Sequence, residues 1–162
     1  MDFLHCVSYL ALVGTVGFFV GRLLPQEWPD PNRGGWNSFP WEREGRIYEK
    51  LGIRRWQKKV PDMSRILPQA IPAKRLEGRD LRHLPLMIRE TCVAELIHWL
   101  LCLASLYCLR LWRGIGGAVT ALLFALGNLP FIVIQRYNRP RLKRLLRCRD
   151  QASAKGGVLC VP

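Results

Sequence analysis

The chain has 162 residues, 49% of them hydrophobic, and its 25 Lys and Arg outnumber its 12 Asp and Glu, which gives a formal net charge of +13. This length suits one domain, and the content of large apolar residues excludes an intrinsically disordered chain. The six cysteines show no Cys-x-x-Cys spacing, which disfavours a disulfide framework. The apolar residues are gathered in runs and not spread over periodic faces, which disfavours a soluble globular domain.

The first apolar run, FLHCVSYLALVGTVGFFVG, occupies residues 3–21. About 20 apolar residues are enough to cross the hydrocarbon core of a bilayer as a helix. No basic stretch precedes the run and no small-x-small cleavage site follows it, so we expect residues 1–24 to form an uncleaved N-terminal anchor helix. Gly17 and Gly21 form a small-xxx-small pair that would let another helix approach closely.

Residues 25–94 are predicted to form a loop at the membrane interface. Pro, Gly and Asn make its first part irregular, and prolines between 61 and 89 predict a connector that follows the surface. Between them, WEREGRIYEKLGIRRWQKKV alternates aromatic and aliphatic residues with charge, which is typical of an amphipathic interfacial segment that meets anionic lipid. A solvated cationic face is the simpler alternative. Gly45 and Gly52 leave two short turns and one continuous rod equally open.

Residues 95–134 predict a transmembrane helical hairpin. The run LIHWLLCLASLYCL has only about 14 residues, short for a span, but Glu95 and Arg110 at its two ends extend it by snorkelling. A tight turn then leads into a longer run, GIGGAVTALLFALGNLPFIVI. Three small residues spaced four apart offer this last helix a smooth packing face: Gly117, Ala121 and Ala125.

The basic residues predict the orientation in the membrane. The interfacial loop 25–94 and the basic tail 135–150 carry most of the 25 Lys and Arg. The positive-inside rule places both on the cytoplasmic side of the cell membrane, which needs about three spans with the N-terminus outside. Topology thus accounts for the charge, and no nucleic-acid partner is expected. The fold class is an all-α, multi-pass integral membrane protein, with residues 151–162 as a disordered tail.

This topology brings two polar clusters to one interfacial depth, because the second and third spans are antiparallel neighbours. The first cluster, at the start of the second span, consists of Glu95 and His98. The second cluster, near the end of the third span, consists of Asn128, Gln135, Arg136 and Asn138.

Glu95 and His98 stand three positions apart and therefore share a helix face. A carboxylate beside an imidazole holds the ring in one tautomer, so His98 can deprotonate a hydroxyl as a general base. The simpler alternative is a helix-capping acid with an interfacial histidine. Glu-x-x-His is also half of a di-metal carboxylate site, but the chain has a single such motif, and we expect neither metal nor cofactor. An acyl-thioester on Cys92 is a further alternative, although Cys92 faces His98 poorly.

The motif IQRYNRPRL follows the third span. The guanidinium groups of Arg136 and Arg139 can chelate phosphate, and the amides of Gln135 and Asn138 can bind hydroxyls or a thioester carbonyl. The alternative is a basic stop-transfer patch, which explains the amides poorly. Pro140 predicts that the helix ends or bends here.

Three stretches, FPWEREGRIYEKLGIRRWQKKVPD, ETCVAELIHW and NLPFIVIQRYNRPRLKRLLR, occur in this order within residues 39–147. They resemble the bacterial glycosyl-4,4'-diaponeurosporenoate acyltransferases of staphyloxanthin-type carotenoid biosynthesis. The resemblance implies that residues 25–150 form an acyltransferase-like membrane domain. It also implies transfer of a fatty acyl group to a primary sugar hydroxyl of a glycosylated carotenoid.

We therefore predict a membrane O-acyltransferase in which His98 is the general base and Glu95 orients it. Its partners would be a thioester acyl donor, a glycosylated carotenoid or other lipid acceptor, and the membrane itself. The predicted substrate-binding residues are Asn128, Gln135, Arg136, Asn138 and Arg139. Two alternatives stay open: the same chemistry on another glycolipid, and a non-enzymatic membrane module that recruits anionic lipid or a partner enzyme.

Overall fold

The structure is a computed structural model that describes residues 1–24, 28–57, 59–60 and 83–154. Within these ranges every element of regular secondary structure is a helix. Three helical stretches are long and apolar enough to cross a membrane. The prediction of an all-α integral membrane protein with three transmembrane helices is therefore confirmed. The connector expected at 61–89 lies mostly outside the described residues.

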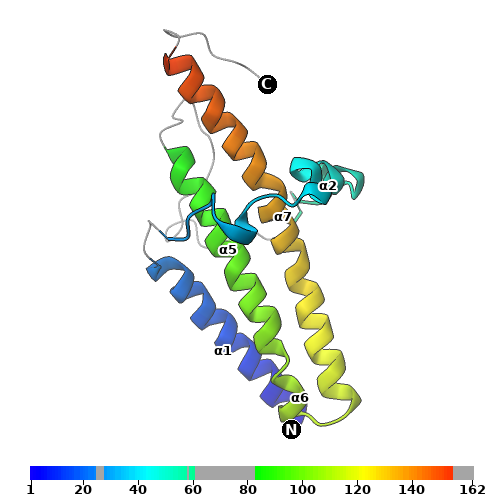
Figure 1. Ribbon diagram of the computed structural model, residues 1–162. Helices are drawn as coiled ribbons and strands as arrows, with labels where there is room; N and C mark the ends of the chain where they lie inside the picture. The colour runs from blue at the N-terminus through cyan, green and yellow to red at the C-terminus, as the bar shows by residue number, and fades with distance from the viewer. Residues whose placement is uncertain (25–27, 58, 61–82, 155–162) are drawn as a thin grey trace.

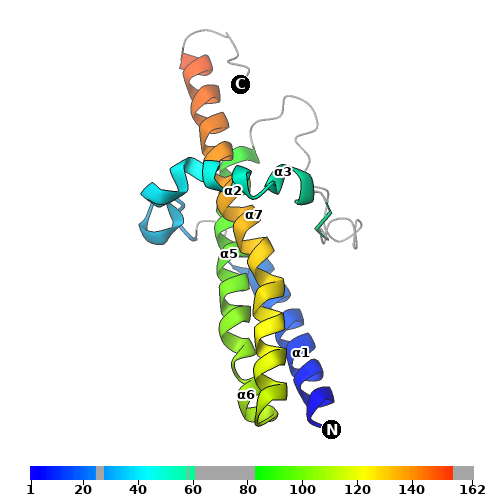
Figure 2. The ribbon, with the colours of Figure 1, turned by 90° about the vertical axis from the view of Figure 1, so that its right-hand side faces the viewer.

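The three helical stretches suited to cross a membrane are built on three long helices that lie side by side, and shorter helices connect or flank them (Figures 1 and 2). The long helices are α1 (Asp2–Leu23), α5 (Leu84–Ser105) and α7 (Ile115–Ala154). The short elements are η1 (Gly34–Trp36), η2 (Pro40–Gly45), α2 (Arg46–Lys50), α3 (Ile53–Trp56) and α6 (Cys108–Leu111). Helix α5 runs antiparallel to α1 and α7, so the N-terminus lies at the same end as the α6–α7 turn.

Helix α1 packs on α5 through its glycines, as the sequence predicted. A methyl group added at Gly17 would lie 3.4 Å from Ile97, and one added at Gly21 would lie equally close to the same side chain. The absence of a side chain at both glycines therefore lets the two helix backbones approach each other. Near the other end of α1, Tyr9 donates a hydrogen bond of 3.0 Å to the carbonyl of Ala104.

Helices α5 and α7 pack along the predicted face of small residues. Ala121 is buried, and its carbonyl accepts a hydrogen bond of 3.3 Å from the Ser105 hydroxyl. One turn further along, the carbonyl of Ala125 accepts a weaker bond from the thiol of Cys102 at 3.7 Å. The small side chains on α7 thus let polar groups of α5 reach its backbone, and this contact holds the hairpin together.

The sequence predicted that the last helix ends or bends at Pro140. The helix does not end there, because α7 continues to Ala154. Its 40 residues extend over about 60 Å, roughly twice the thickness of the hydrocarbon core. The helix passes through Pro140 because this residue is buried against Gly45, and such tertiary packing outweighs the local preference. Residues 151–154, expected to be disordered, extend the helix, since each added residue of a formed helix gains a hydrogen bond.

The described chain from Trp28 to Gln57 crosses α5 and α7 at the level where the basic half of α7 begins (Figure 2). Gly45 and Gly52 have φ values of +89° and +67° and interrupt the helix, so this stretch consists of short turns and not a rod. Trp41 and Leu51 are exposed. Apolar side chains that project from a basic stretch at this level are typical of the predicted interfacial segment.

We expect Gly17→Leu to weaken the packing of α1 on α5, because the new side chain would push Ile97 away. The cost of such overpacking is about 1–3 kcal/mol, measured as a fall in thermal stability of the detergent-solubilised protein. Gly14→Leu is the matched control, because nothing lies within 4 Å of a methyl group added there. Equal melting temperatures for the two variants would contradict the proposed helix contact.

Candidate active site

Glu42 is turned inward by an unusual stretch of backbone. Arg43 and Glu44 have positive φ values of 49° and 56°, and Gly45 follows with +89°, which reverses the chain at the end of η2. The carboxylate of Glu42 is 1% exposed and accepts a hydrogen bond of 2.6 Å from the backbone N–H of Phe39. The Tyr48 hydroxyl donates a further short bond to the same carboxylate. The interfacial segment thus presents a buried negative charge to α7.

Arg136 of α7 binds two carboxylates with one guanidinium group. Its Nε and Nη2 donate to the two oxygens of Glu42 at 2.6 and 2.9 Å, and its Nη1 donates to Glu95 of α5 at 2.7 Å. Two backbone carbonyls of the interfacial segment, those of Gly35 and Asn37, accept further bonds at 3.1 and 3.3 Å. Arg136 therefore joins α5, α7 and the interfacial segment in a single site.

Arg139 lies three positions further along α7 and faces the same way, because the helix continues through Pro140. Its Nη2 donates to Glu95 at 2.5 Å, and its Nε donates to the hydroxyl of Thr91 at 2.9 Å. Its Nη1 reaches the carbonyl of Trp36 at 2.9 Å. We call the buried group of Glu42, Glu95, Arg136 and Arg139 the charge cluster.

The charge cluster contains two carboxylates and two guanidinium groups, so its formal charge is zero. Every buried side-chain nitrogen and oxygen in the described residues has a hydrogen-bond partner. Burial by itself raises the pKa of the Glu42 carboxyl, but hydrogen bonds from Arg136, Tyr48 and Phe39 outweigh burial and hold this pKa below its ordinary value. Burial and the neighbouring carboxylate raise the pKa of Tyr48, which keeps its hydroxyl protonated as a donor.

His98 lies one helical turn from Glu95, on the side of the apolar spans. Its Nδ1 is 2.8 Å from Oδ1 of Asn128, whose Nδ2 donates to the carbonyl of Phe124 at 2.8 Å. Since Asn128 uses its NH₂ group on that carbonyl, its oxygen accepts the Nδ1–H of His98. The ring stacks on Phe131 with centroids 4.7 Å apart. This arrangement places the unprotonated lone pair on Nε2, where it can accept a proton.

The expected pair of Glu95 with His98 is not formed. Each oxygen of Glu95 is bound by an arginine, Arg136 or Arg139, and His98 is bound by Asn128 instead. The physical reason is that charged, forked guanidinium groups bind a carboxylate more strongly than a neutral imidazole does. The same bonds engage both arginines with protein carboxylates, whereas the sequence suggested that they bind the acyl donor.

The two polar clusters do meet at one depth, as the antiparallel topology predicted, since Glu95 and Arg136 are hydrogen-bonded. Gln135 and Asn138 are half-buried, and no side-chain hydrogen bond to either is found in the described part of the chain.

Cys92 is fully buried with its thiol directed at the carbonyl of Ile88, so an acyl group has no access to it. Among the described residues, no three His, Cys, Asp or Glu side chains are grouped to hold a metal ion.

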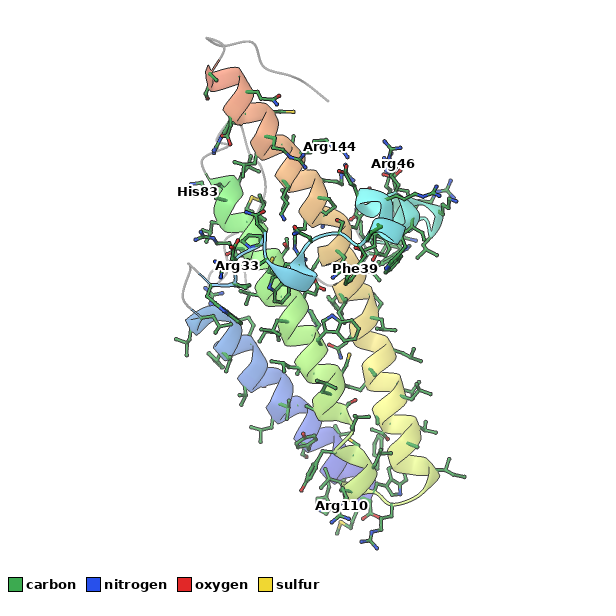
Figure 3. The ribbon with its side chains drawn as sticks, in the orientation of Figure 1. Arg33, Phe39, Arg46, His83, Arg110 and Arg144 are labelled. Atoms are coloured by element: carbon green, nitrogen blue, oxygen red, sulfur yellow. The ribbon has the colours of Figure 1, made fainter. Side chains whose placement is uncertain are left out.

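Sequence reasoning missed three members of the site: Glu42, Tyr48 and Thr91. Glu42 binds a residue 94 positions away and Thr91 one 48 positions away, so local spacing carries no sign of either contact. A usable signal did exist for Glu42 and Tyr48, because both lie in the FPWEREGRIYEK stretch that carries the family resemblance. Figure 3 shows the result: Phe39 lies beside the middle of α7, whereas Arg110 lies at the far end of the hairpin.

A family model described as glycosyl-4,4'-diaponeurosporenoate acyltransferase matches residues 32–148. The chain belongs to this family. It is 32% identical over 143 residues to the glycosyl-4,4'-diaponeurosporenoate acyltransferase of Staphylococcus aureus strain N315, an alignment that covers 88% of this chain and 86% of the relative. The relative from Staphylococcus aureus strain MRSA252 is 29% identical with the same coverage. No solved structure matches the chain.

The family match confirms the resemblance found in the sequence and decides between an enzyme and a non-enzymatic membrane module. The protein is an acyltransferase. The matched region contains the whole charge cluster together with His98 and Asn128, whereas all of α1 lies outside it. Acyltransferase chemistry is therefore to be sought where α5, α7 and the interfacial segment meet.

We expect Arg136→Ala to destabilise the fold strongly, because the carboxylates of Glu42 and Glu95 stay buried after losing the guanidinium group that binds them both. The loss should be about 3–5 kcal/mol, measured by denaturant titration in detergent micelles. Arg144→Ala is the matched control on the same helix, since its ion pair with Glu44 is solvent-exposed and contributes less than about 1 kcal/mol. A stability loss no larger in Arg136→Ala than in the control would contradict the structural role of the cluster.

The lowered pKa of Glu42 predicts how the stability of the protein changes as the pH falls. Its ionised carboxylate contributes stability that is fully present above the ordinary pKa of 4.5. This contribution is lost as the pH falls below that value toward the lowered pKa. Glu42→Gln should therefore show a flatter fall of melting temperature below pH 4.5 than the unsubstituted protein. Parallel curves for the two proteins would mean that Glu42 takes no part in acid unfolding.

Proposed function

We propose that the protein transfers a fatty acyl group from a thioester donor to a sugar hydroxyl of a glycosylated carotenoid or a similar glycolipid. The single observation that carries this proposal is the position of His98, at the edge of the apolar spans of a family acyltransferase, with an Nε2 that has no hydrogen-bond partner among the described residues. We place the reaction at the cytoplasmic face of the cell membrane, because the basic interfacial loop and tail favour that side.

His98 is the proposed general base, and Asn128 is the residue that positions it. The lone pair of Nε2 accepts the proton of the acceptor hydroxyl while the hydroxyl oxygen attacks the carbonyl carbon of the thioester. The carbon–sulfur bond breaks, and the leaving thiolate takes the proton from Nε2 of His98. The ester and the free thiol are the products, and His98 returns to its neutral form. Direct transfer suits the buried state of Cys92.

The depth of His98 suits an amphiphilic acceptor. His98 lies about 4.5 Å further into the apolar region than Glu95, by the helical rise over three residues. An acceptor can keep its apolar body in the bilayer while its sugar reaches this level. Gln135 and Asn138, which are half-buried on the neighbouring turn of α7, are proposed to hold the sugar or the thioester carbonyl. The charge cluster is proposed to support this site and not to bind substrate.

Replacement of His98 by Ala should lower the formation of acylated glycolipid at least about 100-fold, the usual contribution of a general base. The measurement is mass spectrometry of the lipids formed by membranes with matched amounts of folded protein. His5→Ala is the matched control, because His5 is exposed on α1 outside the matched family region.

Asn128→Asp adds a readout that a purely structural role would not change. A carboxylate at this position stabilises the protonated imidazole, so the rise of kcat/KM with pH should move to higher pH. Normal product formation by His98→Ala, or an unshifted pH profile in Asn128→Asp, would remove His98 from the mechanism.

A further inference from the structure

The outer half of α7 borders an open cavity that the proposed reaction leaves unexplained. The cavity has a volume of about 240 Å³ and lies next to the charge cluster, between α7 and the interfacial segment. Its lining includes Trp36, Ser38, Glu44, Lys143 and Arg147. The α7 residues that line it, from Arg139 to Arg147, follow the apolar part of this helix.

The cavity collects positive charge from one helix face. Arg139, Lys143 and Arg147 are spaced four apart and therefore lie in one row. Glu95 neutralises Arg139, but Lys143 bonds only to neutral acceptors, the carbonyl of Pro31 at 2.6 Å and the amide oxygen of Asn37 at 2.9 Å. Arg147 forms no hydrogen bond or ion pair with the described residues.

The other cations of this half of α7 are engaged elsewhere. Arg144 pairs with Glu44 at 2.8 Å, so the single carboxylate that lines the cavity is already neutralised. Arg149 pairs with Asp150, and Arg141 is bound to the hydroxyl of Tyr137. Lys143 and Arg147 therefore line the cavity without a direct ion pair to a carboxylate in the described chain, and Asp30 and Glu44 act on them only at longer range. A basic stop-transfer patch requires no such cavity.

We propose that this cavity binds the phosphate of the acyl donor, a thioester carried on a phosphorylated pantetheine arm. This proposal rests on the proposed function, because a donor-binding cavity has a role only if the protein transfers acyl groups. Lys143, held in place by its two neutral acceptors, contributes a fixed point charge. Arg147 contributes a planar fork that matches two phosphate oxygens. The Ser38 hydroxyl on the opposite wall can add a neutral donor.

The separation of the cavity from His98 fits a donor with a long arm. Along α7, Lys143 follows Asn128, the partner of His98, by 15 positions, or about 22 Å. An extended pantetheine arm can cover a distance of this order with the phosphate in the cavity and the thioester near His98.

The experiment uses the full chain in nanodiscs of zwitterionic phosphatidylcholine, with coenzyme A as the probe in equilibrium dialysis. Lys143→Ala and Arg147→Ala should each weaken its binding about tenfold or more, because each removes a charge-assisted contact to phosphate. Arg46→Ala should change it less than about twofold. Arg46 is a matched control, because it removes the same charge from the interfacial segment outside the cavity lining (Figure 3).

Further arms distinguish the sources of phosphate. Pantetheine, which lacks phosphate, should bind the cavity variants and the unsubstituted protein equally. Acyl carrier protein replaces coenzyme A in a second series, and loss of either interaction in the cavity variants supports the proposal. Equal binding by cavity and control variants in both series overturns it, and so does absence of binding of both probes to the unsubstituted protein. In a third series, phosphatidylglycerol is the probe. If the cavity variants lose phosphatidylglycerol binding but keep the binding of coenzyme A and acyl carrier protein, the proposal is overturned in favour of a lipid head group.

Kinetics separates this proposal from the proposed function. The cavity variants should raise the donor KM with little change in kcat, because they remove binding that is equal in the ground and transition states. His98→Ala should do the opposite and leave coenzyme A binding intact. Donor binding that depends on Lys143 and Arg147 without any ester formation would reject the proposed function and leave the cavity assignment standing.

Discussion

The interaction on which the rest of the structure depends is the guanidinium group of Arg136, which holds one carboxylate from α5 and another from the interfacial segment. Charges at the edge of a membrane are costly unless they are paired and hydrogen-bonded. Arg136 meets this condition with Glu42 and Glu95 together, and Arg139 completes the balance. The cluster therefore sets both the height of the interfacial segment on α7 and the register of α5 against α7.

That register separates a charged layer from a neutral one. In the charged layer the carboxylates are bound by arginines and support the fold. One turn deeper, His98 and Asn128 meet in surroundings formed by Phe131 and Phe124, where a neutral imidazole can be buried at far lower cost than an ion. In the proposed reaction, His98 acts at this level as a weakly solvated base on a hydroxyl acceptor delivered from the bilayer.

The continuous α7 helix connects two environments. Its first half lies against α5 within the apolar region, and its second half extends outward with a row of cations on one side. Pro140 lies between the two halves, yet packing against Gly45 keeps the helix intact. Because the helix is unbroken, residues four apart stay in one row from the charge cluster to the outer cavity. In the proposed reaction, a water-soluble donor and a lipid acceptor would thus approach one site from opposite sides.

The sequence by itself determined the spans, their antiparallel order, the glycine contact of α1 and the meeting of two polar clusters at one depth. These features follow from apolar run length and helical spacing, which are local properties. Only the tertiary structure decided which pairs are formed. Local spacing offers Glu95 the nearby His98 as a partner, but the fold brings Arg136 to it from 41 positions away. The stronger, charged donor prevails once the fold brings it within reach. For the same reason Glu42, whose partner is 94 positions distant, could be placed only by the folded chain.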